Sequence, residues 1–312
     1  VKTLVTSASR KLPLLRAVAA ELGDVVAGDS DPQCLAAFAW PSFWQMPGLD
    51  AESVDDVIDA ISDRGFTHVI PTRDADVALL STRRDAMEAR GVALLASTPD
   101  SVELCQDKLA FARALTDAGL PAIPTVPLGE LPYGAASSLV VKERFGAGYR
   151  GLVLDVSVDD ADTAAAAMDQ PVLQPFVAGP EFSVDAYRSR DGRMLGVIAR
   201  SRDLVIGGES QVTTTVDPAP FTEVVVELLA AVDLQGHAVV QLIDAADGLR
   251  IVECNPRLGG ASTLALAAGL RSLAWFAAES RGDDPARLPF EPKPVPLQLV
   301  RAPEDVIGAP RL

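Results

Sequence analysis

Segment 249–257 places a carboxylate, an amide and a guanidinium at every second position, in Glu253, Asn255 and Arg257. Alternate residues of a β-strand share one face. In a strand, these three side chains would therefore point into one space, and Ile251 would continue that face. Polar groups in phase on an otherwise apolar strand need partners. The pattern favours a face that binds a metal ion and phosphate over the alternative, a solvated surface hairpin.

A second strand is expected just upstream, over residues 238–243, and the intervening residues 244–248 end in Asp-Gly, a pair favoured in hairpin turns. If three residues close the hairpin, Gln241 lies opposite Glu253. Mg²⁺ takes oxygen ligands and prefers a few from the protein together with substrate phosphates. The side-chain oxygens of Gln241, Glu253 and Asn255 form such a set.

This hairpin resembles the last metal-binding hairpin of the ATP-grasp superfamily, in the branch similar to the carbamoyl-phosphate synthase large subunit, which carries a Gln and then Glu-x-Asn-Pro-Arg. The resemblance implies that Gln241, Glu253 and Asn255 bind Mg²⁺ or Mn²⁺ together with the phosphates of ATP. It implies that Arg257 contacts the transferred phosphoryl group. The implied fold combines α/β and α+β parts, a Rossmann-like parallel-sheet domain followed by a two-lobed ATP-grasp domain.

Two lysines in earlier segments fit the same family. Lys108 lies in an expected helix, and Lys142 ends a β-branched strand that a glycine-rich loop, residues 146–151, joins to a second strand. A Walker phosphate loop is missing, because no Gly-Lys-Ser/Thr runs into a helix. The resemblance implies that both lysines reach the nucleotide phosphates. It also implies that the loop is a mobile lid, whose Gly146 and Gly148 approach them. The weaker alternative for Lys108 is a solvated helix lysine. Taken alone, the loop reads equally as a plain hairpin turn.

Segment 171–185 resembles the hinge between the two lobes in that family, where backbone groups bind the edge of adenine. By resemblance, Glu181 binds the ribose hydroxyls. Pro175 has no N–H to donate, so the donor to adenine should be Phe176 or Val177, and the sequence leaves that choice open. The residues expected around the adenine are Gln174, Phe176 and Val177.

Further residues are expected near the phosphate and acceptor pockets. Arg202 is a catalytic candidate by resemblance, together with Lys142 and Arg257, and it shares a strand face with Arg200. An ordinary charged edge strand is the alternative. The candidate substrate-binding residues are Arg73, which precedes Asp74 after a strand's carboxyl end, Glu209, and Gly259 and Gly260 at a helix start suited to an anion. A solvated loop and a tight turn are the alternatives for Arg73 and the glycines.

Residues 1–96 alternate apolar strands with helical patterns, as in a doubly wound parallel sheet. A dinucleotide-binding domain would look similar, with Asp29 or Asp31 as the ribose-binding acid. Residues 6–11, between the first strand and the first helix, contain no glycine, so the close backbone approach to a pyrophosphate is missing. An NAD-dependent oxidoreductase is therefore the weaker alternative.

The chain is expected to divide into a domain over residues 1–96, an ATP-grasp domain over 97–295 with a small lobe at about 122–177, and a tail over 296–312 to which no function is assigned. Single helices are expected over residues 12–22, 76–90 and 106–118. The first of these should end at Gly23, and Thr98 should cap a new segment.

Composition excludes several classes of protein. The formal charge of −16, from 43 acidic and 27 basic residues, repels nucleic acid. The three cysteines lie far apart and form no metal-binding spacing, which favours a reducing compartment, and no apolar run reaches membrane-spanning length. We expect a cytoplasmic protein without membrane or nucleic-acid partners. With only His68 and His237 present, a His-rich zinc site or serine–histidine triad is not favoured, and His68 is expected to be structural.

The resemblance implies ATP-dependent ligation. A carboxylate attacks the γ-phosphate, which gives ADP and an acyl phosphate, and an amine or similar nucleophile displaces phosphate. The expected partners are therefore small-molecule carboxylates and amines, and the oligomeric state, including a homodimer, is left open. An ATP-binding regulatory protein without turnover is the alternative from another class.

Overall fold

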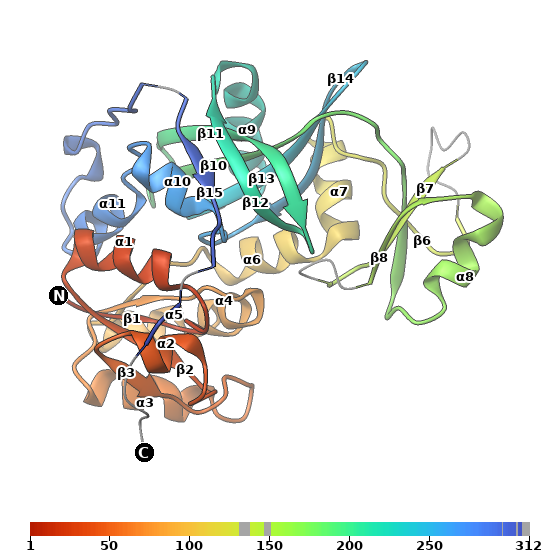
Figure 1. Ribbon diagram of the computed structural model, residues 1–312. Helices are drawn as coiled ribbons and strands as arrows, with labels where there is room; N and C mark the ends of the chain where they lie inside the picture. Colours follow the sequence, from red (N-terminus) through yellow and green to blue (C-terminus); the bar gives the residue numbers. More distant parts are fainter. Residues whose placement is uncertain (131–137, 147–150, 295, 304, 308–312) are drawn as a thin grey trace.

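Three β-sheets organise the chain, and Figure 1 shows one in each of three regions. The computed structural model describes residues 1–130, 138–146, 151–294, 296–303 and 305–307. A parallel sheet comes first in the chain and two antiparallel sheets follow. This arrangement confirms the predicted combination of an α/β domain with an α+β part.

The N-terminal domain has a five-stranded parallel sheet in the order β3-β2-β1-β4-β5. Its elements are β1 (Lys2–Val5), α1 (Leu12–Leu22), β2 (Asp24–Asp29), α2 (Leu35–Ala39), β3 (Phe43–Gln45), α3 (Val54–Asp63), β4 (His68–Ile70), α4 (Asp74–Ser81), α5 (Arg84–Ala89) and β5 (Ala93–Leu94). The chain runs outward from β1 in one direction and from β4 in the other. The loops after β1 and β4 therefore lie at the switch point of the sheet, where α/β proteins bind ligands.

Local sequence sets the ends of the first helix. Gly23 follows α1 with a φ of 86°, and its N–H donates to the carbonyl of Ala19 (3.0 Å). Only glycine adopts that conformation without strain. The predicted bounds of this helix are confirmed.

The helix predicted over residues 76–90 is two helices, α4 and α5. The hydroxyl of Ser81 donates to the Ala78 carbonyl (2.8 Å), and that of Thr82 donates to the Leu79 carbonyl (2.7 Å). Such side-chain bonds compete with the backbone bonds that would continue a helix. The prediction also missed α2 and β3, which are too short to give a periodic pattern.

The helix predicted over residues 106–118 is α7 (Lys108–Asp117), and a separate helix, α6 (Pro99–Gln106), precedes it. Asp107 separates them in an extended conformation, and its carboxylate accepts the N–H groups of Leu109 (3.0 Å) and Ala110 (3.1 Å). Asp107 is therefore the N-cap of α7. Thr98 caps α6 as predicted, accepting from the N–H of Ser101 (3.4 Å).

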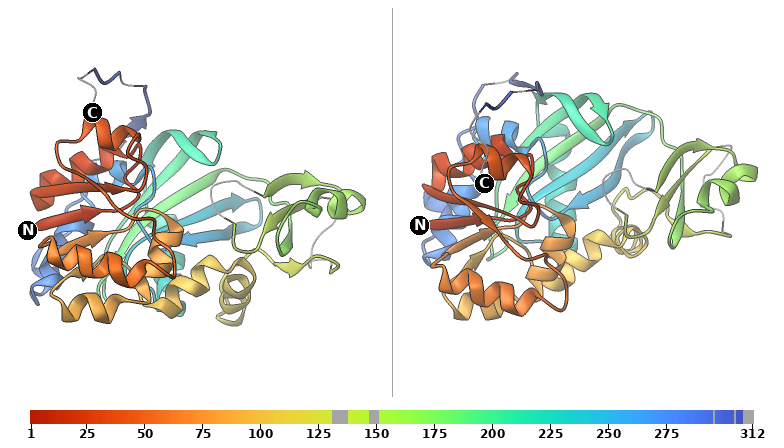
Figure 2. Two further views of the ribbon diagram at one scale, coloured as in Figure 1. Left: turned by 90° about the horizontal axis from the view of Figure 1, so that it is seen from below. Right: turned by 60° about the horizontal axis from the view of Figure 1, so that its bottom comes forward.

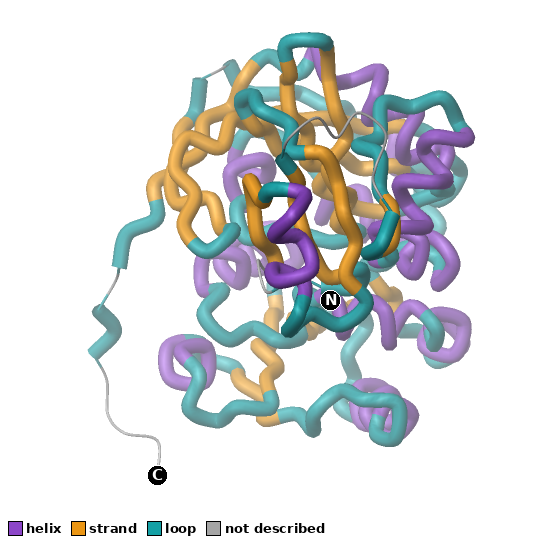
Figure 3. Tube along the Cα trace, turned by 90° about the vertical axis from the view of Figure 1, so that its right-hand side faces the viewer, coloured by secondary structure: helices purple, strands orange, loops and turns teal. Residues whose placement is uncertain are grey.

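The small lobe is a four-stranded antiparallel sheet in the order β6-β9-β7-β8, and Figure 3 shows it facing the viewer. Its elements are β6 (Val126–Pro127), β7 (Leu139–Glu143), β8 (Leu152–Val156), the 3-10 turn Val158–Asp160, α8 (Ala161–Ala165) and β9 (Pro171–Pro175). The lobe has a core of its own, in which Leu139 and Val141 pack on Ala161 and Leu173.

The large sheet has six antiparallel strands in the order β14-β13-β10-β11-β12-β15. Its elements are β10 (Glu181–Arg188), β11 (Met194–Ile206), β12 (Glu209–Val216), α9 (Ala219–Ala231), β13 (Gly236–Ala245), β14 (Gly248–Asn255), α10 (Ser262–Ala267), α11 (Ser272–Ser280), the 3-10 turn Pro285–Arg287 and β15 (Gln298–Val300). On one face, Val184 and Val240 pack with Leu115 of α7 and Leu228 of α9. Alternation therefore directs Ser183, Asp185, Arg200 and Gln241 to the opposite face.

The predicted boundary at residue 296 is wrong. Strand β15 pairs with β12, with Leu299 opposite Thr213, so the supposed tail belongs to the large sheet. The short strand lies between prolines, which hid it from sequence patterns.

The N-terminal domain packs on the C-terminal helices, where Leu15 and Val18 of α1 share a core with Trp275 and Phe276 of α11 (Figure 2). No helix in the described ranges has both the length and the apolar character needed to cross a membrane.

Candidate nucleotide and metal site

The β13–β14 hairpin carries the predicted metal set. Ala245 pairs with Gly248, so two residues close the turn rather than the three expected. Gln241 nevertheless lies opposite Glu253, as predicted. The predicted pairing is confirmed, although the turn that was expected to produce it is wrong.

A β-bulge reconciles the two registers. Leu242 pairs with Ile251, whereas Gln241 pairs with Glu253. Val252 is therefore the extra residue on β14. The bulge changes the direction of Ile251, which packs in the same buried core as Cys254 instead of continuing the metal face. That part of the prediction is wrong, because a strict two-residue alternation does not continue through a bulge.

The three predicted metal ligands contact each other. The amide nitrogens of Gln241 and Asn255 both donate to Oε1 of Glu253, at 2.7 and 2.8 Å. With its nitrogens committed, each amide keeps its oxygen as an acceptor. In the described ranges, no three His, Cys, Asp or Glu side chains gather into a metal-binding group. A set of one carboxylate and two amide oxygens fits a hard cation such as Mg²⁺, which completes its shell with phosphates and water.

Arg257 joins this hairpin to the N-terminal domain. Its guanidinium donates to both carboxylate oxygens of Asp74, from Nε (2.5 Å) and Nη2 (2.8 Å), and Nη2 lies 3.5 Å from Oδ1 of Asn255. Burial lowers the pKa of Arg257, but the hydrogen bonds and charge of Asp74 outweigh it and raise the pKa above its usual value. The guanidinium is therefore a fixed positive charge beside the metal set.

The two predicted lysines lie within electrostatic reach of the same carboxylate. Burial lowers the pKa of Lys142 to about 8 and also lowers that of Lys108, while the charge of Glu253 acts in the opposite direction on both. The ammonium of Lys108 donates to the carbonyl of Gly146. Both lysines thus interact with the carboxylate of the β13–β14 hairpin.

Asp107 holds Lys108 in place, a role that the sequence analysis missed. Besides capping α7, its carboxylate accepts two hydrogen bonds from Arg144 at the end of β7, at 2.7 and 2.5 Å. An aspartate directly before a helix is an N-cap signal, but nothing local shows its second partner.

Glu181 and Arg202 form an ion pair on the polar face, with Nε of Arg202 3.2 Å from Oε1 of Glu181. Burial raises the pKa of Glu181, Arg202 lowers it, and the charge of Glu253 raises it. The predicted ribose-binding acid is therefore close to the metal set. Arg202 is held by Glu181 and by the carbonyl of Gly208 (3.1 Å), which defines its orientation.

The two backbone N–H groups expected as adenine donors have different partners at the hinge. The N–H of Phe176 donates to the Ser138 carbonyl (3.0 Å), whereas the N–H of Val177 forms no hydrogen bond with a described residue. Phe176 is 40% exposed and can cover a ring. The side chain of Gln174 is buried and donates to Thr125 (2.7 Å), so its amide is engaged within the small lobe.

The predicted lid is only partly placed. Gly146 follows β7, and its carbonyl accepts from Lys108. Gly148 lies in 147–150, outside the described residues, as does most of the predicted lid.

The candidate substrate-binding residues do not form one group. Arg73 is half-exposed and pairs with buried Asp76 (2.7 Å). Glu209 pairs with Arg301 (3.3 Å), which also lies against Gly260. The N–H of Gly259 donates to Oγ of Ser262 (2.8 Å), so the predicted free anion-binding N–H is already used. That prediction is corrected for Gly259, and Arg301 had no sequence signal.

Both histidines have structural contacts. His68 bonds the hydroxyls of Thr67 (2.9 Å) and Ser280 (2.7 Å), and burial lowers its pKa to about 4. His237 is buried with Ser272 at 2.9 Å. The structural role predicted for His68 is confirmed.

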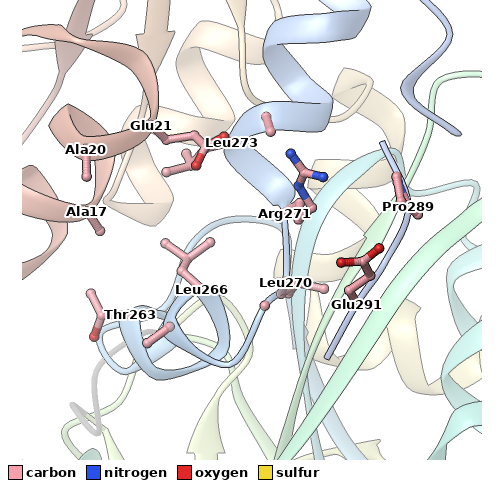
Figure 4. Close-up of a pocket in the computed structure, with 13 residues that line it drawn as sticks. Ala17, Ala20, Glu21, Thr263, Leu266, Leu270, Arg271, Leu273, Pro289 and Glu291 are labelled. Carbon is pink, nitrogen blue, oxygen red and sulfur yellow. The ribbon is translucent and has the colours of Figure 1, made fainter. Parts of the chain in front are cut away.

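A groove of about 460 Å³ lies away from this site, between α1 and the segment from α10 to α11 (Figure 4). Ala17, Glu21, Leu266 and Arg271 are among its lining residues, which include none of the predicted site residues. The groove is therefore not part of the candidate site.

One family model matches part of the chain. Residues 167–300 match the model of a family described as ATP-grasp in the biosynthetic pathway with Ter operon. No curated protein matches the chain.

Solved structures resemble the chain over most of its length. An L-amino acid ligase from Bacillus licheniformis is 18% identical with a TM-score of 0.71, over 90% of this chain and 74% of that one. The biotin carboxylase domain of a 2-oxoglutarate carboxylase from Hydrogenobacter thermophilus, in complex with MgADP, ADP and bicarbonate, is 15% identical with a TM-score of 0.70, over 91% and 70%. N5-carboxyaminoimidazole ribonucleotide synthetase from Thermotoga maritima is 16% identical with a TM-score of 0.67, over 95% and 79%. The chain therefore has the ATP-grasp fold.

Proposed function

We propose that this chain is an ATP- and Mg²⁺-dependent, ADP-forming ligase that activates a carboxylate as an acyl phosphate and joins it to an amine or similar nucleophile. One observation carries the proposal. Glu253 is hydrogen-bonded by both amides of the metal set and interacts electrostatically with Lys108, Lys142 and Arg257. These groups come from separate segments and interact with one carboxylate.

The oxygen-bearing side chains of the hairpin also fit a bound Mg²⁺. Gln241, Glu253 and Asn255 would hold it, and its charge would offset that of the phosphates. Val177 would donate its N–H to adenine, and Glu181 would accept from the ribose hydroxyls. The proposed nucleotide then extends from the hinge to the β13–β14 hairpin.

Phosphoryl transfer to a carboxylate needs positioning and charge neutralisation more than a nucleophilic side chain. Lys108 and Lys142 would offset charge on the nucleotide, and Arg257 would offset charge on the phosphoryl group that moves. The carboxylate oxygen bonds to the γ-phosphorus as the bond to the β-phosphate oxygen breaks, which gives ADP and an acyl phosphate. The amine then attacks the acyl carbon, losing a proton, and phosphate leaves.

The decisive experiment measures ADP release from Mg-ATP with a panel of amino acids and small carboxylic acids, using hydroxylamine as a general nucleophile. An active acid should give a hydroxamate and ADP in equal amounts. The matched control is the same panel with Glu253→Gln. Mg-ATP binding without ADP release for any acid would favour the regulatory alternative, and stabilisation by NAD but not by Mg-ATP would exclude the proposal.

A further inference from the structure

A partly buried lysine at the domain boundary has no acidic partner. Lys11 immediately precedes α1, and its ammonium donates one hydrogen bond, to the carbonyl of Ser7 (2.6 Å). No carboxylate of the described residues forms an ion pair with it. An ammonium has three N–H donors, so two are left for water or a ligand.

The charges around Lys11 are engaged elsewhere. Asp76 accepts hydrogen bonds from Thr6, Ser7 and Arg73. Asp29 accepts two backbone N–H groups. Burial lowers the pKa of Lys11, and the nearby charge of Arg257 lowers it further, while Asp76 and Asp29 act in the opposite direction. A bound anion would relieve this repulsion between cations.

The loop that carries Lys11 has a defined and strained shape. Ser7 and Ser9 have φ values of 47° and 37°, a conformation that residues other than glycine rarely adopt. The N–H of Ala8 donates to the Gly28 carbonyl (3.1 Å), and that of Ser9 donates to Asp29 (2.9 Å). Such strain persists where surrounding contacts enforce it and is concentrated at functional sites.

Arg257 connects this loop to the metal set. It lies 3.5 Å from Oδ1 of Asn255 and pairs with Asp74 of α4, the helix whose Asp76 accepts a hydrogen bond from Ser7 of this loop. The loops after β1 and β4, at the switch point of the N-terminal sheet, therefore border the place where the proposed phosphoryl transfer would occur.

We infer that Lys11, with Arg73 beside it, binds a second anionic group of the acceptor, a carboxylate or phosphate that does not itself react. This inference rests on the proposed ligase function. The reacting carboxylate must meet the phosphoryl group beside Arg257. If the Lys11 ammonium bound that same carboxylate, it would stabilise the carboxylate before the attack and make it a weaker nucleophile. An ammonium on a remote anion positions the acceptor without weakening its nucleophile. The acceptor class is therefore a diacid or a phosphorylated acid.

The test compares dianionic and monoanionic acids in the ADP-release assay. Succinate, glutarate and aspartate represent diacids, O-phosphoserine represents phosphorylated acids, and butyrate and alanine are the monoanionic controls. For the best dianion, Lys11→Met should raise KM about tenfold or more and change kcat less than about twofold, because one charged hydrogen bond is lost in binding. Lys11→Arg should restore most of the affinity.

Lys293→Met is the matched control, because it removes the same charge from an exposed lysine outside the site. Its KM should equal that of the wild type. An unchanged KM in Lys11→Met, or a wild-type preference for monoanionic acids, would overturn the inference.

A binding measurement separates this inference from the ligase function. With Mg-ADP present, succinate or O-phosphoserine should raise the melting temperature of the wild type and of Lys293→Met but not of Lys11→Met. This result would support the anion site even if no acid gave ADP release. Equal shifts in all three proteins, or no shift in the wild type, would refute the site while leaving the ligase proposal intact.

Discussion

The proposed site has two halves that are built in different ways. The metal half is the β13–β14 hairpin, and the acceptor half consists of the loops after β1 and β4 with the candidate substrate-binding residues. In the hairpin, the bonds to Glu253 join residues 12 and 2 positions apart. At the N-terminal side, Ser7 and Asp76 are 69 positions apart, and Arg257 and Asp74 are 183 apart. The metal half can therefore form within one supersecondary unit, whereas the acceptor half exists only when both domains are folded and packed.

The largest expected effect is on the locally built half. Glu253→Gln should lower kcat about a hundredfold or more. The variant lacks the negative charge that would hold the metal ion beside the phosphates, where charge develops during the reaction. The melting temperature should change little, because Gln can still accept from both amides. Activity and thermal unfolding are measured on the variant and on Glu223→Gln, which changes an exposed helix residue. Near-normal ADP release would show that Glu253 is not a metal ligand.

The next effect concerns the link between the halves. Asp74→Asn should lower kcat roughly tenfold with KM for ATP nearly unchanged, because Arg257 loses its two-oxygen partner and its position. Asp55→Asn is the control, since it breaks the exposed pair with Arg83 (2.8 Å) and should have almost no effect. If Asp74→Asn weakened ATP binding by the same factor as it lowers kcat, the two halves would not act independently.

The sequence predicted the locally built half well. Strand alternation and hairpin pairing are local rules, so they placed Gln241 opposite Glu253 even though the turn length was wrong. The errors have local physical causes as well, since the bulge at Val252 reverses Ile251 and hydroxyl bonds divide the helix predicted over residues 76–90.

The other half could not be predicted in the same way. Lys11 and Arg301 become relevant only through contacts with distant segments, namely Arg257 for the first and Glu209 for the second. Strand β15 is three residues long, so its pairing depends on the edge that β12 already offers. Periodicity within a segment carries no information about such partners.

A smaller effect should appear with pH. The pKa of Lys142 is lowered to about 8. Its side chain is therefore positively charged below that pH, and the charge is lost as the pH rises through it. Mg-ATP affinity, measured by calorimetry, should therefore be about fivefold to tenfold weaker at pH 9 than at pH 7.5. In Lys142→Arg the charge persists at both pH values, so this step should disappear. An equal loss of Mg-ATP affinity between these pH values in Lys142→Arg would show that another group titrates.

The smallest effect is expected at the edge of the acceptor half. A Cβ on Gly260 would lie 2.6 Å from Nη2 of Arg301, the end of a flexible side chain, whereas a Cβ on Gly179 would lie 2.3 Å from the backbone oxygen of Asp244. Gly260→Ala should therefore destabilise the protein by about 0.5 kcal/mol or less, and Gly179→Ala by roughly 1–3 kcal/mol. Thermal and urea unfolding of both variants measure the difference. If Gly260→Ala were as destabilising as Gly179→Ala, Arg301 would be fixed as rigidly as backbone, and the acceptor half would be as preorganised as the metal hairpin.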